Sequence, residues 1–177
     1  MISEPPAPGR QPGEVPPIEA GAASAPDPAR RAEVAAVLDD VRQWAQRTPP
    51  VLGIALVGSW ARGTPTTRSD VDLVLVLAAP GHLAHATDWL SDVLPHRAPR
   101  VVRTARWGPL RERRVRLAGG LDVEFGLVPP SWAATTPVDA GTARVVREGL
   151  VVLHDPAGLF ERLVAAVAGA DRTSRPP

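Results

Sequence analysis

The residues of this 177-residue chain whose types and spacing best suit chemistry are two aspartates, Asp70 and Asp72, separated by one apolar residue. Side chains of an extended strand alternate between its two faces, so both carboxylates lie on one face while Val71 and Leu73 point into the core. Two carboxylates placed in this way can bridge one or two divalent ions. Magnesium prefers hard oxygen ligands and often shares them with substrate phosphates, so the pair predicts magnesium-assisted phosphate chemistry.

A Gly-Ser turn precedes this acidic pair. Gly58-Ser59 closes an apolar run, and ten residues separate Ser59 from Asp70. Glycine lets the backbone approach a triphosphate closely, and serine offers a hydroxyl and a backbone N–H. A helix beginning near residue 60 would direct its positive end to the same place, and Arg62 would add a positive charge. We therefore expect Gly58, Ser59, Arg62 and Ser69 to bind the nucleotide.

Each half of this pattern also has an ordinary structural explanation. An Asp-x-Asp pair at a strand edge is common as a solvated face, and Gly-Ser is common as a turn. The combination, after one apolar strand and at the start of another, favours a functional site. A Walker-type phosphate loop is excluded, because that loop requires lysine and the chain contains none.

The spacing of Gly58-Ser59 and Asp70-x-Asp72 resembles the signature of the DNA polymerase β-like nucleotidyltransferase superfamily, which includes minimal and aminoglycoside nucleotidyltransferases. The resemblance covers roughly residues 51–128. It implies an enzyme that uses magnesium, as two ions, to transfer a nucleoside monophosphate from a nucleoside triphosphate such as ATP. The acceptor would be a hydroxyl of a small molecule or of a protein, and pyrophosphate would be released.

The resemblance also implies a third carboxylate on a later strand beside the first pair. The segment Leu121 to Phe125 offers Asp122 and Glu124 on one strand face. We prefer Glu124, because Val123 and Phe125 flank it at the more buried centre of the strand, and we keep Asp122 in reserve. By resemblance, Glu124 would bind the catalytic ion and help to deprotonate the acceptor. Ser59 and Arg62 would hold the outgoing phosphates.

The elements that must position these residues follow from the periodicity of apolar residues. We predict helices over residues 27–48, 82–94, 141–148 and 159–168, and strands over residues 51–59, 71–77, 101–107, 111–117, 121–128 and 151–154. Gly108-Pro109 and Gly119-Gly120 are turn signals, and the second favours a tight hairpin. This order predicts an α/β (α+β) fold, with a mixed, mostly antiparallel sheet and helices packed on it, as in a nucleotidyltransferase palm.

One folded domain is expected, over residues 27–170. Residues 1–26 are rich in proline and alanine without apolar periodicity, so we predict a disordered tail there, and a second one over residues 171–177. Cysteine is absent, which excludes disulfides and thiolate metal sites. We find neither a run of about 20 apolar residues nor a secretory signal, and expect no membrane partner and a cytoplasmic location.

Charge bears on possible partners. The formal net charge is only +1, which argues against non-specific binding of nucleic acid. The most basic stretch runs from Arg97 to Arg116; Glu112 interrupts it and its arginines fall on both strand faces, so we predict a solvated hairpin. Few residues follow the third-acid strand, so we expect a protein partner, a homodimer or a protein substrate to complete the acceptor pocket. The alternative function is a catalytically degraded binding module, or the antitoxin-type partner of a toxin.

Overall fold

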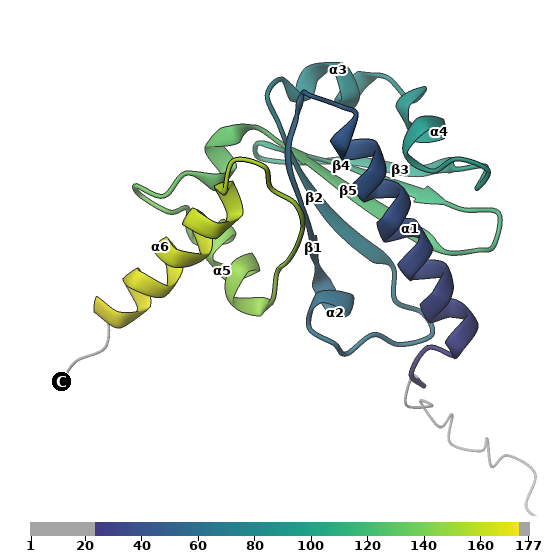
Figure 1. The fold of residues 1–177 in the computed structure, drawn as a ribbon, viewed down its shortest axis with the longest axis horizontal. Coiled ribbons are helices and arrows are strands. Elements are labelled where there is room, and N and C mark those ends of the chain that lie inside the picture. Colours follow the sequence, from purple (N-terminus) through teal and green to yellow (C-terminus); the bar gives the residue numbers. More distant parts are fainter. Residues whose placement is uncertain (1–23, 174–177) are drawn as a thin grey trace, which may run out of the picture.

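The computed structural model describes residues 24–173, which form a six-stranded sheet with helices on both faces (Figure 1). The strand order is β3-β4-β5-β2-β1-β6. The strands are β1 (Val51–Val57), β2 (Val71–Leu77), β3 (Arg100–Trp107), β4 (Leu110–Arg116), β5 (Asp122–Val128) and β6 (Val151–His154). The helices are α1 (Pro28–Gln46), α2 (Gly58–Ala61), α3 (Pro80–His85), α4 (Trp89–Val93), η1 (Pro130–Ala133), α5 (Ala140–Glu148) and α6 (Leu159–Thr173).

The sheet is mixed and mostly antiparallel, which confirms the predicted fold class. β1 pairs antiparallel with β2 and β6, and β4 pairs antiparallel with β3 and β5. The pairing of β2 with β5 is parallel and places Asp72 beside Glu124. The chain between these two strands contains α3, α4 and the β3–β4 hairpin, so the central pair of the sheet joins distant segments of the sequence.

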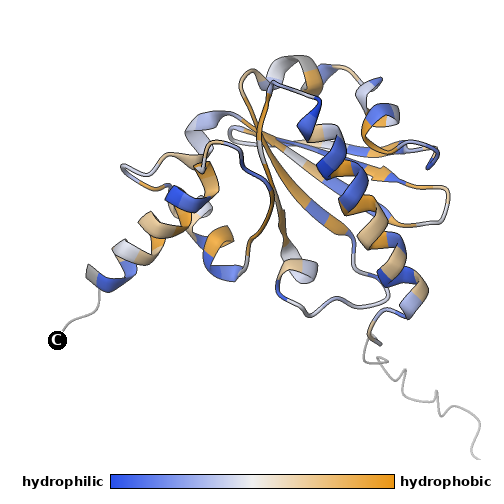
Figure 2. Cartoon of the chain, viewed as in Figure 1, coloured by the Kyte–Doolittle hydropathy of each residue, from blue (hydrophilic) through white to orange (hydrophobic). Residues whose placement is uncertain are grey.

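Apolar residues cover both faces of the sheet and form two separate clusters. On one face, α1 and α4 pack against alternate residues of β1, β2, β4 and β5, among them Leu73, Val123 and Phe125. On the other face, η1, α5 and α6 pack against Val74, Val76 and Val128 near one end of the sheet. Figure 2 shows apolar colour along β1 and both polar and apolar residues along α1, as expected for a strand inside the sheet and a helix on its surface.

Helix α1 begins and ends close to the predicted bounds. Asp27 accepts a hydrogen bond of 2.7 Å from the backbone N–H of Arg30, and Pro28 occupies the first turn. The helix ends before Pro49-Pro50. Its buried residues recur at helical spacing: Val34, Val37, Val41, Trp44 and Ala45.

The helix predicted over residues 82–94 is wrong in extent, because the structure has two short helices there, α3 and α4. The break lies at residues 86–88. Asp88 accepts a hydrogen bond of 3.0 Å from the backbone N–H of Trp89, which begins the second helix. The indole N–H of Trp89 lies within 3.0 Å of the Leu83 carbonyl and 3.2 Å of the Ala86 carbonyl, so it ties the two helices together.

The predicted tails fall mainly outside the part of the chain that the structure describes. Residues 1–23 and 174–177 are not described, so the tail predicted over 1–26 lies outside it except for residues 24–26, which directly precede α1. Helix α6 continues to Thr173, beyond the predicted end of the domain at residue 170. In the described region, none of the helices has the length and apolar character needed to cross a membrane.

Phe125 is the residue that best tests this arrangement. It is fully buried, lies next to Glu124 on β5, and meets Trp89 edge-on with ring centroids 5.2 Å apart. We expect Phe125→Ala to lower the free energy of unfolding by about 3–5 kcal/mol, measured by urea denaturation. The control Val152→Ala, at a side chain that is 44% exposed on edge strand β6, should cost well under about 1 kcal/mol. Equal losses in the two variants would contradict the packing described.

Candidate active site

The acids predicted from the sequence meet where β2 and β5 begin, beside the end of β1. Asp70 directly precedes β2, and Asp72 pairs with Val57 at the end of β1 and with Glu124 on β5. One carboxylate oxygen from each of Asp70, Asp72 and Glu124 lies within 4.8 Å of the other two. All three side chains are partly buried. The parallel register between β2 and β5 therefore brings together residues that lie more than fifty positions apart.

The structure distinguishes the two candidates for the third acid by position. Glu124 lies in the cluster, whereas Asp122 lies outside it, at the beginning of β5, and is paired with Arg116. Arg116 donates two hydrogen bonds of 2.8 Å to the two carboxylate oxygens of Asp122, and this pairing lowers the pKa of Asp122 below its usual value. Glu124 is the better geometric partner for the aspartate pair, and its role as a ligand is a prediction.

Gly58 lies directly against the Asp72 carboxylate. Its φ is +70°, in the left-handed region that favours glycine. A Cβ at this position would overlap Oδ2 of Asp72 and lie 2.9 Å from its Cγ, so the backbone turn and the carboxylate fit together only without a side chain. The predicted helix begins here rather than near Trp60, and α2 is a single turn of four residues at the end of β1 (Figure 1).

The other predicted nucleotide-binding residues lie around this turn. Ser59 is in α2, and its carbonyl accepts a hydrogen bond of 3.0 Å from the backbone N–H of Thr64. Arg62 follows α2, and its charge lowers the pKa of Asp72. The hydroxyl of Ser69 accepts a hydrogen bond of 2.9 Å from the backbone N–H of Thr66, so it stabilises the loop that leads into Asp70.

Arg114 is a residue of the site that the sequence reasoning missed. Its Nη2 donates hydrogen bonds to Oδ2 of Asp70 and, at 2.7 Å, to Oε2 of Glu124. Its Nε lies 2.9 Å from the same Glu124 oxygen, and Nη2 of Arg103 lies 3.4 Å from it. The prediction of a solvated hairpin is therefore wrong for Arg114, and also for Glu112 and Arg113, which are buried.

The electrostatics of the cluster favour a cation. Burial raises the pKa of Asp72 to about 7, and the nearby charges of Asp70 and Glu124 raise it as well. Arg114 and Arg62 act in the opposite direction without cancelling the shift. The negative charge at Asp72 is therefore under-compensated, and three carboxylates are the hard oxygen donors that magnesium prefers. The residues present thus fit a divalent ion.

A hollow of about 250 Å³ adjoins the acids. It is lined by Gly58, Asp72 and Glu124 on one side and by Val145 and Glu148 of α5 on another. Arg144 donates a hydrogen bond of 2.7 Å to the Glu148 carboxylate and lowers its pKa, so Glu148 keeps its negative charge near the hollow. No sequence signal singled out Glu148, because its place beside the acids depends on how α5 packs.

Residues 38–113 match a family described as "Nucleotidyltransferase domain". The match includes Gly58, Ser59, Asp70 and Asp72 and ends before Glu124. The match agrees with the resemblance to the DNA polymerase β-like nucleotidyltransferase superfamily that Gly58-Ser59 and Asp70-x-Asp72 indicate. None of the curated proteins compared with this chain matches it.

Solved structures that match part of this chain include a poly(U) polymerase and a terminal U-transferase. One is the Cid1 poly(U) polymerase with magnesium and 3'-dATP, at 15% identity and a TM-score of 0.46, covering 58% of this chain and 32% of that one. Another is a cytoplasmic RNA terminal U-transferase, at 15% identity and a TM-score of 0.45, covering 59% and 31%. This chain therefore spans about a third of the length of either. The second of these proteins is described as an RNA transferase. The expectation that nucleic acid is not a partner of this chain stays a prediction.

Two glycines of equal backbone conformation allow a matched test of the turn. Gly63 has a φ of +72°, close to that of Gly58, but a Cβ there would have no atom within 4 Å. Both alanine variants therefore introduce the same backbone strain, and only Gly58→Ala displaces the Asp72 carboxylate. We expect Gly58→Ala to weaken Mn²⁺ binding by at least about tenfold by calorimetry, with less than about twofold change in Gly63→Ala. Equal affinities in the two variants would contradict a role of this close contact in shaping the site.

The raised pKa of Asp72 has a consequence for stability in the absence of metal. The folded state holds the Asp72 proton more tightly than the unfolded state, so stability falls as the pH rises from about 4 to about 7. Asp72→Asn should therefore be more stable than the wild type at pH 8, by about 2–3 kcal/mol after solvent screening, and equal to it near pH 4. Urea denaturation in EDTA at both pH values measures the difference.

Asp122→Asn is the control for this pH dependence. Its pKa is lowered by Arg116, so its stabilising contribution is present at pH 8 and is lost as the pH falls through its folded pKa. This variant should be less stable than the wild type at pH 8, opposite in sign to Asp72→Asn. A destabilised Asp72→Asn at pH 8 would refute the electrostatic description of the cluster.

Proposed function

We propose that this chain, which carries a nucleotidyltransferase domain, uses magnesium to transfer a nucleoside monophosphate from a nucleoside triphosphate to a hydroxyl of a small molecule or a protein. The observation that carries the proposal is the placement of Asp70, Asp72 and Glu124, whose carboxylate oxygens lie within 4.8 Å of one another beside the Gly58 turn. A phosphate-binding turn next to a set of hard oxygen ligands is the arrangement that magnesium-dependent phosphoryl chemistry requires.

Asp70, Asp72 and Glu124 would hold the magnesium, as two ions. When bound, magnesium neutralises charge on the phosphate oxygens and lowers the pKa of a coordinated hydroxyl. The hollow of about 250 Å³ beside Asp72 and Glu124 gives the triphosphate a place next to these ligands. Ser59 and Arg62, at the turn that follows β1, would hold the outgoing phosphates through hydrogen bonds and charge.

The reaction is an in-line displacement at the α-phosphorus. The acceptor oxygen forms a bond to the α-phosphorus, the bond to the bridging oxygen breaks, and pyrophosphate leaves with that electron pair. Glu124 accepts the proton of the attacking hydroxyl. The chemistry thus requires Glu124 to be free of Arg114 on at least one oxygen, and Arg114 contacts only Oε2 of this carboxylate.

The contact of Arg114 with Asp70 and Glu124 is the observation that favours the alternative, a binding module or antitoxin-type partner with a degraded site. A guanidinium between two carboxylates supplies part of the charge that a metal would supply. The two functions are distinguished by metal binding, since the enzyme must bind Mn²⁺ or Mg²⁺ at the acids and a degraded module need not. The raised pKa of Asp72 in the presence of Arg114 favours the enzyme.

Pyrophosphate release tests the proposal directly. ATP, GTP, CTP and UTP are incubated in turn with Mg²⁺ and candidate hydroxyl acceptors, and release is measured by a coupled assay. Asp70→Asn, Asp72→Asn and Glu124→Gln should each lower the rate by at least about a hundredfold, because each removes a charged ligand. Asp122→Asn, whose carboxylate is bound to Arg116, should retain activity within about threefold.

If none of the acceptors tested supports pyrophosphate release, binding of the triphosphate can still be measured. Calorimetry with each triphosphate in Mg²⁺ should show binding that is lost in Asp72→Asn and kept in Asp122→Asn. If the wild type binds none of the four triphosphates with Mg²⁺ present, the enzyme proposal fails and the binding-module alternative is favoured.

A further inference from the structure

A second hollow, of about 350 Å³, lies on the β3–β4 hairpin. Arg114 faces the acids on one side of β4, and alternation along the strand turns Arg111 and Arg113 to the opposite side, where Arg113 reaches the Ala86 carbonyl between α3 and α4. The hollow is therefore on the face of the hairpin turned away from the candidate active site. Its lining residues are His85, Thr104, Ala105, Arg106, Arg111, Glu112, Arg113 and Leu127.

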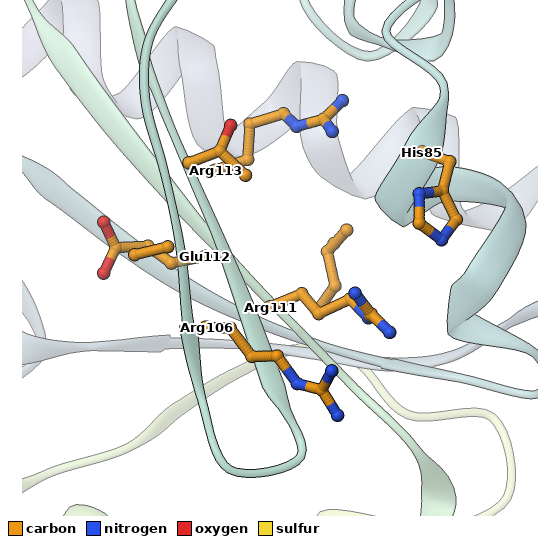
Figure 3. Close-up of a pocket in the computed structure, with 8 residues that line it drawn as sticks. His85, Arg106, Arg111, Glu112 and Arg113 are labelled. Atoms are coloured by element: carbon orange, nitrogen blue, oxygen red, sulfur yellow. The ribbon is translucent and has the colours of Figure 1, made fainter.

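The charges around this hollow are almost all positive. Figure 3 shows Arg106 and Arg111 side by side, with His85 across from them. The single acid in the lining, Glu112, points away from the three arginines in the same view, and its carboxylate accepts hydrogen bonds from Arg103 and from the indole N–H of Trp107. The negative charge of Glu112 is therefore paired with Arg103 on the other face of the hairpin and does not neutralise the arginines of the hollow.

The strand register places like charges opposite each other, which destabilises the fold when no ligand is bound. Arg106 and Arg111 are directly opposite each other on β3 and β4, and Thr104 is opposite Arg113. Like charges in directly opposed cross-strand positions destabilise a sheet. Within the described residues, no carboxylate is bonded to Arg106 or to Arg111; Arg106 donates at 3.3 Å to the Gly108 carbonyl. An anion bound between Arg106 and Arg111 would attract both guanidinium groups and so offset their mutual repulsion.

Arg113 also lines the hollow. It is only 5% exposed, and it donates a hydrogen bond to the carbonyl of Ala86, which fixes its guanidinium between the sheet and the α3–α4 connection. Burial lowers its pKa, which means that its positive charge is poorly solvated. Because Arg113 lines the hollow, its positive charge favours an anion there, as the charges of Arg106 and Arg111 do.

We propose that this hollow is an anion-binding site that takes a phosphate group between Arg106, Arg111 and Arg113. The planar guanidinium matches the oxygens of phosphate with two parallel hydrogen bonds, and Thr104 and His85 add further polar groups. The volume admits a phosphate with an attached group. The site is separate from the proposed triphosphate site, because the two lie on opposite faces of the hairpin, and it does not depend on the proposed function.

Calorimetry in EDTA tests the site, since without metal the acidic cluster repels anions. The probes are inorganic phosphate, pyrophosphate and a single-stranded oligonucleotide, each added to the full chain. Wild type should bind at least one probe, and Arg106→Gln and Arg111→Gln should each weaken that binding by at least about tenfold. Arg172→Gln, an exposed arginine near the end of α6, is the control and should change affinity less than about twofold.

The probes distinguish the source of the phosphate. Oligonucleotide binding that is tighter than that of pyrophosphate and is lost in the same variants identifies a nucleic-acid backbone. Pyrophosphate or phosphate binding without tighter oligonucleotide binding identifies a small phosphorylated molecule. The proposal is overturned if none of the three probes binds, or if Arg111→Gln binds as tightly as the wild type.

A stability measurement keeps the proposal testable if a variant folds poorly. Removing one of two facing arginines relieves their repulsion, so Arg111→Gln should melt at or above the wild-type temperature without phosphate. Added pyrophosphate should then raise the melting temperature of the wild type and leave that of Arg111→Gln unchanged. A variant that melts lower than the wild type without anion, yet gains the same increase with pyrophosphate, would refute the site.

Discussion

Three carboxylates held within 4.8 Å of one another repel, and the surrounding structure must offset that repulsion before any ligand arrives. The sheet does so from its opposite face, where Leu73, Val123 and Phe125 alternate with the acids and are almost fully buried. Those apolar contacts fix the parallel register that sets Asp72 beside Glu124. This packing and the Arg114 guanidinium, which bonds both Asp70 and Glu124, keep the acids together. The charge imbalance that remains at Asp72 is available for a cation.

The β3–β4 hairpin separates two kinds of charge. Its side toward the acids carries Arg103 and Arg114, which are both bonded to carboxylates. Its other side carries Arg106 and Arg111, which face each other across the strands without an acid between them in the described region. Alternation along two short strands therefore produces one compensated face and one basic face. The net charge of the whole chain is only +1 and does not reveal this basic face. The stretch from Arg97 to Arg116 alone contains eight arginines and one glutamate.

The sequence was sufficient where the signal is local. The bounds of β2 and β6, the cap of α1 at Asp27 and the same-face placement of the two aspartates follow from periodicity and capping, and the structure confirms them. Arg114 required a register that the sequence leaves open. A two-residue turn at Gly119-Gly120 would pair Ala118 with Leu121, whereas Leu117 is the residue bonded to Leu121. That one-residue shift moves every side chain of β4 to the other face, and only the actual register directs Arg114 to Glu124. The break between α3 and α4 was also missed. There the ring of Trp89 packs against Trp44 and Phe125, and these tertiary contacts override a continuous apolar pattern.

The most direct test of the central claim, that Asp70, Asp72 and Glu124 bind a divalent ion beside a triphosphate, is a crystal structure with Mn²⁺ and a triphosphate analogue that cannot be cleaved between the α- and β-phosphates. Anomalous scattering locates manganese without reference to the protein. We expect at least one manganese peak about 2.0–2.3 Å from oxygens of these carboxylates, with the triphosphate in the hollow next to Gly58. A bound analogue with no manganese at the three acids, and Arg114 still joined to Asp70 and Glu124, would contradict it.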